Sequence, residues 1–198
     1  MSVMDTLIVD RTAEDVERIR ELRNKILTEG LDSLTQEEKD EYQSDHKGAY
    51  NISDLNRVSD AGTYILTVMD TFYTQYMSYL SARSLGGDPI YDPYFDPNYL
   101  TYTFPTFSGL AYIPQATIAQ WLAGLVLVRS VSVNPDDLPT LPDITGLAHA
   151  DYSTANDIER LLSGSWEAFQ QYMINQYNLA DRGYASIPYS DEFDAGEY

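Results

Sequence analysis

Apolar residues recur at steps of three and four positions in several stretches of the chain, which is the spacing of an amphipathic α-helix. In the longest stretch, apolar residues recur from Leu55 to Leu80, and the helix would be roughly 45 Å long. Gly62 interrupts this apolar face, and either a close helix crossing or a kink would explain a glycine there. The periodicity predicts helices over residues 13–28, 53–83, 114–132 and 154–178.

Short polar side chains mark where these helices begin. Thr12 to Asp15 and Thr35 to Glu38 have the form of a capping box, and the second box predicts an additional short polar helix. Asn51 or Ser53 is expected to cap the long helix, and Ser153-Thr154 the last one. The fold class that follows is mainly α, a bundle of about four to five helices.

Residues 88–99 repeat the pattern Asp-Pro-x-aromatic three times, and a proline at every fourth position forbids a continuous helix. We therefore expect an extended Pro- and Tyr-rich arm over about 84–113, within a single domain of residues 1–182. Residues 183–198 form an acidic C-terminal tail without periodicity. Aromatic residues of the arm and the tail are predicted to be exposed and to bind partner proteins: Tyr91, Tyr94, Phe95, Tyr99, Tyr102, Phe104, Phe107, Tyr189, Phe193 and Tyr198.

The charge balance narrows the choice of partners. Lys and Arg number 12 against 31 Asp and Glu, so the formal net charge is −19. Phosphate groups repel such a chain, which argues against binding to nucleic acid or to an anionic membrane surface. The 17 Tyr favour extensive contact with other proteins, because tyrosine combines a large apolar ring with a polar tip.

Few residues could carry chemistry. The chain has no cysteine, and its two histidines, His46 and His149, have no companion at metal-ligand spacing. The Asp88, Asp92 and Asp96 set does not match a calcium loop and fits plain Asp-Pro turns better. We therefore predict no catalytic residue, no metal and no cofactor, and a protein that is not an enzyme.

The segment from Asp54 to Arg57 is the most specific polar cluster. Asp54 is expected in the first turn of the long helix, with Arg57 three residues later on the same side. Arg11, at the start of the first helix, is expected to pair with this region. Arg11, Asp54 and Arg57 are thus predicted to form an internal structural clasp rather than a catalytic site.

The stretch Gly48-Ala-Tyr-Asn-Ile-Ser-Asp-Leu-Asn-Arg-Val58 has the form GAYNxxDLNRV. It resembles the most specific signature of a family of small virion proteins encoded in tail modules of phages and prophages of Gram-positive bacteria, whose other motifs also have counterparts in order along the chain. Weaker matches are Asp10-Arg-Thr-Ala-Glu-Asp-Val16, Leu34-Thr-Gln-Glu-Glu-Lys39, Ile113-Pro-Gln-Ala-Thr-Ile-Ala-Gln-Trp-Leu122, Tyr152-Ser-Thr-Ala-Asn-Asp-Ile-Glu159 and Phe193-Asp-Ala-Gly-Glu-Tyr198. The Asp-Pro repeat departs from the family pattern, which usually has a shorter linker there.

The resemblance implies a minor structural protein of the tail or baseplate, with no enzymatic activity. We expect a non-catalytic adaptor in symmetric multi-copy assembly with other virion proteins, assembled in the host cytoplasm and released in the virion by lysis. One alternative is a receptor- or glycan-binding module of the particle that uses residues 88–112. A second is an acidic DNA mimic that inhibits host proteins, which the net charge motivates.

Overall fold

The computed structural model describes residues 2–43, 47–82, 102–109, 113–132, 135–143 and 151–181, apart from the side chain of residue 179. Within these ranges the chain is mainly α, as expected, and contains no strand. The α-helices of the described ranges are α1 (Ala13–Glu29), α2 (Gln36–Gln43), α3 (Ile52–Ala82), α4 (Gln115–Ser130) and α6 (Tyr152–Asp181). Their short 3-10 helices are η1 (Val3–Thr6), η2 (Leu31–Ser33) and η3 (Pro135–Asp137).

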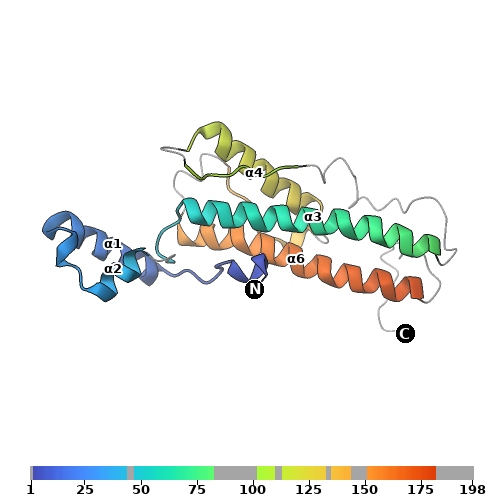
Figure 1. The fold of residues 1–198 in the computed structure, drawn as a ribbon, viewed down its shortest axis with the longest axis horizontal. Coiled ribbons are helices and arrows are strands. Elements are labelled where there is room, and N and C mark those ends of the chain that lie inside the picture. Colours follow the sequence, from blue (N-terminus) through green and yellow to red (C-terminus); the bar gives the residue numbers. More distant parts are fainter. Residues whose placement is uncertain are drawn as a thin grey trace.

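Helices α3, α4 and α6 form the bundle. Helices α3 and α6 lie side by side and run in the same direction, with α4 packed across both (Figure 1). Contacts fix this direction: Arg57 meets Glu159 near the starts of α3 and α6, and Tyr79 donates a hydrogen bond to Asp181 near their ends. Parallel neighbours need a long connection, and the chain between α3 and α6 supplies it, with α4 on the way.

The core lies where the three bundle helices meet. Trp121 of α4, Ile65 of α3 and Phe169 of α6 are among its largest fully buried side chains. Burial of one such side chain stabilises the folded state by about 1.5–3 kcal/mol. The apolar residues that recur along each of these helices therefore form the face that the helix packs into the core.

The arm residues nearest to α4 lie inside the bundle. Residues 102–107 are extended, as expected, but Phe104 and Phe107 are 4% and 0% exposed, so their predicted exposure is wrong. The ring of Phe104 covers Gly62 of α3 and Gly124 of α4, where a Cβ atom would lie only 2.5 and 2.6 Å from ring carbons. Gly62 therefore makes room for an aromatic ring of the arm, which neither a helix crossing nor a kink describes.

Tyr102 also belongs to this packed segment. Its ring meets that of Phe104 edge to face at 5.4 Å, and its hydroxyl donates a hydrogen bond to the carbonyl oxygen of Gln120 on α4. Tyr102 is half-buried, so the packing of the arm already uses much of its surface. The sequence could not show that these three aromatic residues pack against the bundle, because no local pattern distinguishes an aromatic ring in a core from an exposed ring that binds a partner protein.

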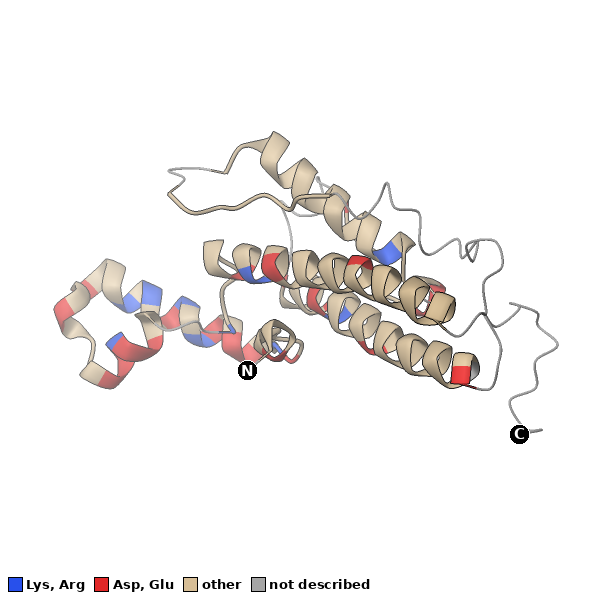
Figure 2. Cartoon of the chain, turned by 45° about the vertical axis from the view of Figure 1, so that its right-hand side comes forward, with Lys and Arg blue, Asp and Glu red and all other residues tan. Residues whose placement is uncertain are grey.

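Helices α1 and α2 form a hairpin that projects from one end of the bundle (Figure 1). Leu22 and Leu34 are buried within it, and the ion pairs Arg18–Glu41 and Lys25–Glu38 join its two helices at 2.8 Å each. Charged residues are concentrated in this hairpin, whereas the bundle helices carry few of them (Figure 2). The hairpin is thus a small, charged projection that has little hydrophobic core of its own.

Helix starts follow the predicted caps with one exception. Both hydrogen bonds of the predicted capping boxes form at Thr12 and at Thr35. Asn51 caps α3 by accepting a hydrogen bond from the backbone N–H of Ser53 at 2.8 Å.

The cap predicted at Ser153-Thr154 is wrong. Helix α6 begins earlier, and Asp151 is its cap, because its side chain accepts a hydrogen bond from the backbone N–H of Thr154 at 2.9 Å.

Candidate functional site

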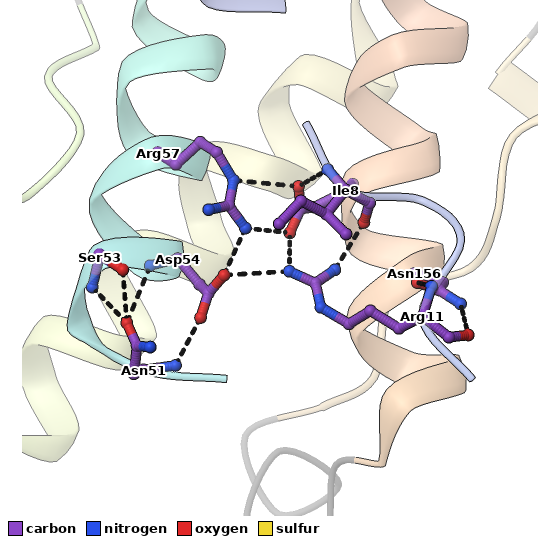
Figure 3. Close-up of polar contacts among 8 residues, drawn as sticks. Ile8, Arg11, Asn51, Ser53, Asp54, Arg57 and Asn156 are labelled. Carbon is purple, nitrogen blue, oxygen red and sulfur yellow. Dashed lines mark hydrogen bonds and ion pairs between the residues drawn. The ribbon is translucent and has the colours of Figure 1, made fainter. Parts of the chain in front are cut away.

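The polar cluster predicted from the sequence lies where the N-terminal segment meets the starts of α3 and α6 (Figure 3). Arg11 directly precedes the N-cap of α1, and Asp54 and Arg57 lie in the first two turns of α3. Glu159 is contributed by the second turn of α6. We call Arg11, Asp54, Arg57 and Glu159 the clasp.

Arg11 bridges the two long helices. Its Nη2 atom lies 3.0 Å from Oδ1 of Asp54 on α3 and 2.7 Å from Oε1 of Glu159 on α6. The three side chains are 1%, 2% and 0% exposed, so these ion pairs are shielded from solvent. A single guanidinium thereby holds together three segments that are far apart in the sequence.

Arg57 completes the charge balance. It donates to Oδ1 of Asp54, and its Nη2 and Nε atoms lie 2.9 and 3.3 Å from the two carboxylate oxygens of Glu159. Burial opposes the charged guanidinium, but the hydrogen bonds and charges of Glu159 and Asp54 outweigh it and raise the pKa of Arg57 above its ordinary value. Two cations and two anions make the clasp neutral, the condition under which charges are tolerated in a protein interior.

Backbone groups fill most of the remaining hydrogen-bonding positions. Ile8 donates its N–H to Glu159 at 2.6 Å, and its carbonyl oxygen accepts from Arg11 at 2.5 Å. The backbone of Arg11 exchanges two hydrogen bonds with the side chain of Asn156, at 3.0 and 2.9 Å. Asp54 also accepts from the N–H of Asn51 at 2.7 Å. The extended segment before α1 is thus fastened to α6 along its length.

Tyr50 closes one side of the clasp. Its ring centroid lies 5.2 Å from Cζ of Arg11, a cation–π contact. Its hydroxyl is buried and has no hydrogen-bond partner among the described residues. Burial, together with the negative charges of Glu159 and Asp54, raises the pKa of Tyr50 well above its ordinary value.

The arrangement is suited to holding segments together rather than to chemistry. A general acid or base has to reach a substrate, whereas both carboxylates here are buried and ion-paired with arginines. The structure brings together the three residues predicted from the sequence, Arg11, Asp54 and Arg57. Sequence reasoning missed Glu159 and Asn156, although each is a polar residue on the apolar face of α6, next to the buried Ala155, Ile158 and Leu162.

The other predicted partner-binding residues are not placed. Tyr91, Tyr94, Phe95 and Tyr99 of the arm, and Tyr189, Phe193 and Tyr198 of the tail, lie outside the described residues. Across the described ranges, no group of three or more His, Cys, Asp or Glu side chains is arranged to hold a metal ion. Among the same residues, no helix is both long and apolar enough to cross a membrane.

Comparison of the chain with protein-family models, with curated proteins and with solved structures gives no match. The resemblance to small phage virion proteins therefore stays a prediction.

Proposed function

We propose that this chain is a non-catalytic structural subunit of a bacteriophage or prophage particle, in the tail or baseplate region, that docks to other virion proteins. One observation carries the proposal: three stretches on which the virion-protein resemblance rests meet in the clasp. Arg11 comes from the stretch at residues 10–16, Asp54 and Arg57 come from the stretch at 48–58, and Asn156 and Glu159 come from the stretch at 152–159. Because these residues bind one another in the clasp, one structural requirement explains why all three separated stretches match the family's motifs.

The position of the clasp supports an adaptor. It lies at the base of the projecting hairpin, because Arg11 directly precedes the N-cap of α1. It ties the segment before α1 to both long helices (Figure 3). A second tie, between Lys47 and Asp10 at 2.5 Å, joins the two chain segments that enter and leave the hairpin. A limb fixed in this way can present a defined surface to a neighbouring subunit, because less conformational freedom is lost when it binds.

Charge supports docking to proteins rather than to nucleic acid. The formal net charge of −19 favours basic or neutral protein surfaces and repels phosphate backbones. Copies of such a chain also repel one another except where opposite charges meet, which favours a defined contact in a symmetric assembly.

Purified particles of the phage or prophage that encodes this chain provide the test. Mass spectrometry should find the protein in the particles, and cryo-EM should resolve ordered, symmetric copies at the tail or baseplate. Particles from a strain without the gene are the control for that density. If the protein is absent from purified wild-type particles, the proposal is wrong, and the acidic-inhibitor alternative becomes the leading hypothesis.

A further inference from the structure

One surface of the projecting hairpin combines exposed apolar and basic side chains. Arg20, Arg23 and Leu27 lie on the same side of α1, at steps of three and four residues, and we call them the α1 face. Leu27 is 72% exposed, more than any other large hydrophobic residue that the structure describes as exposed. Leu27 therefore offers a partner protein an exposed apolar side chain beside two arginines.

The two arginines of the α1 face can bind the carboxylates of a partner. Arg23 has no carboxylate partner among the described residues, and the partner of Arg20 is the exposed Glu17, at 2.6 Å. Exposed pairs of this kind are weak and are easily exchanged for another partner. By contrast, Arg18 and Lys25 are engaged by acids of α2. In a chain with a net charge of −19, two arginines three residues apart, followed one turn later by an exposed leucine, favour an acidic partner that carries an apolar group.

We infer that the α1 face binds the acidic C-terminal tail of a second copy of this chain. The tail carries Asp191-Glu192-Phe193-Asp194, an aromatic residue between acids, which is complementary to a leucine beside arginines. Phe193 would pack on Leu27, and the flanking carboxylates would pair with Arg20 and Arg23. Arginine suits this contact, because its guanidinium binds carboxylates through two parallel hydrogen bonds.

Chain length makes the contact intermolecular. Helix α6 ends at Asp181, at the opposite end of the bundle from the hairpin (Figure 1). Its 30 residues span about 45 Å. Phe193 lies 12 residues beyond Asp181, so a fully extended tail carries it at most about 43 Å. Even fully extended along its own α6, the tail thus brings Phe193 only about as far as the start of that helix, and the hairpin projects beyond that point (Figure 1).

The resulting contact is head-to-tail. One copy contributes its hairpin and the next contributes its tail, so each copy uses two different surfaces, and repetition gives a closed ring or an open filament. The inference names a contact for the multi-copy assembly proposed above and rests on that proposal. Its test uses purified protein alone, so the two can fail separately.

The test compares the mass of the full chain in solution with that of two variants, by sedimentation or light scattering up to about 100 µM protein. The full chain is expected to self-associate at low salt and to dissociate at high salt, because salt screens the contacts between charges. The double variant R20E/R23E and a chain truncated after residue 182 are each expected to be monomeric. Lys39→Glu is the control: it makes the same kind of charge reversal at one position on α2, half the charge change of the double variant, and should leave association within twofold of the wild type.

Mixing the two variants gives the decisive result. The R20E/R23E chain keeps a normal tail and the truncated chain keeps a normal α1 face, so a mixture should form a one-to-one dimer that grows no further. Circular dichroism shows whether each variant is folded. A monomeric wild type, association that survives either change, or variants that do not pair on mixing would each overturn the inference.

Discussion

The guanidinium of Arg11 lies 2.7 Å from the carboxylate of Glu159, although 148 residues separate them in the chain. The contact joins the segment before the hairpin to the start of the last helix, in an environment with almost no solvent. The stability of the bundle and the attachment of its projecting limb therefore depend on the same few charges.

Glu159→Gln tests that dependence. The substitution leaves two buried arginines with Asp54 as their remaining carboxylate, and an uncompensated buried charge costs about 3–5 kcal/mol of stability. Urea unfolding followed by circular dichroism measures the loss. Asp157→Asn on the same helix is the matched control, because the 3.4 Å pair of Asp157 with Arg160 is exposed and is worth about 1 kcal/mol at most. Equal losses for the two variants would contradict a structural role for the clasp.

Gly62→Ala tests the packing of the arm. Helix propensity alone predicts a gain of about 1 kcal/mol. The added Cβ, however, would lie 2.5 Å from the ring of Phe104, and crowding in a packed core costs about 1–3 kcal/mol. We expect a net loss of stability that largely disappears when Phe104 is also changed to Leu, which a double-mutant cycle measures. A more stable Gly62→Ala protein would show that the ring does not occupy this site.

Stability should fall between pH 10 and pH 12. Burial, with added effects from Tyr177 and Tyr79, raises the pKa of Tyr76 to about 12, above its ordinary value of 10.0. A group whose pKa is raised on folding stabilises the protein fully below its unfolded pKa and loses that contribution as the pH rises through its folded pKa. Tyr50 shifts in the same direction and should add to the fall.

Tyr76→Phe is the variant that isolates this effect. Its free energy of unfolding, measured by urea titration at several pH values, should fall less steeply over this pH window than that of the wild type. At neutral pH the variant should be less stable, because the hydroxyl of Tyr76 hydrogen-bonds to Gln176 at 3.2 Å. Parallel alkaline profiles for the two proteins would exclude Tyr76 as a contributor.

Asp151→Ala tests the start of the last helix. Loss of an N-cap side chain costs about 1 kcal/mol, whereas Ser153→Ala should cost little, since Asp151 is the residue that caps α6. Its hydrogen bond from Thr154 lowers the pKa of Asp151, so the advantage over the alanine variant should be present at neutral pH and lost as the pH falls through that lowered pKa. If Ser153→Ala lowers the stability more than Asp151→Ala does, the cap predicted from the sequence is the correct one.

The sequence by itself determined the helices and most of their boundaries. Apolar periodicity and capping residues such as Thr12, Thr35 and Asn51 act between positions at most a few residues apart, so they can be identified without knowing the fold. The same local logic placed Asp54 and Arg57 on one side of a helix and marked Arg11 as a companion. It also predicted the extended backbone of residues 102–107.

Only the tertiary structure decided which side chains those helices bring together. Glu159 completes the clasp because two parallel helices place their first turns side by side, and no local pattern specifies which helix packs against which. Phe104 is buried because Gly62 and Gly124, on different helices, leave space for the same ring. Burial and charge pairing depend on neighbours that are remote in the chain, and for that reason the sequence predicted the elements of this protein more completely than its contacts.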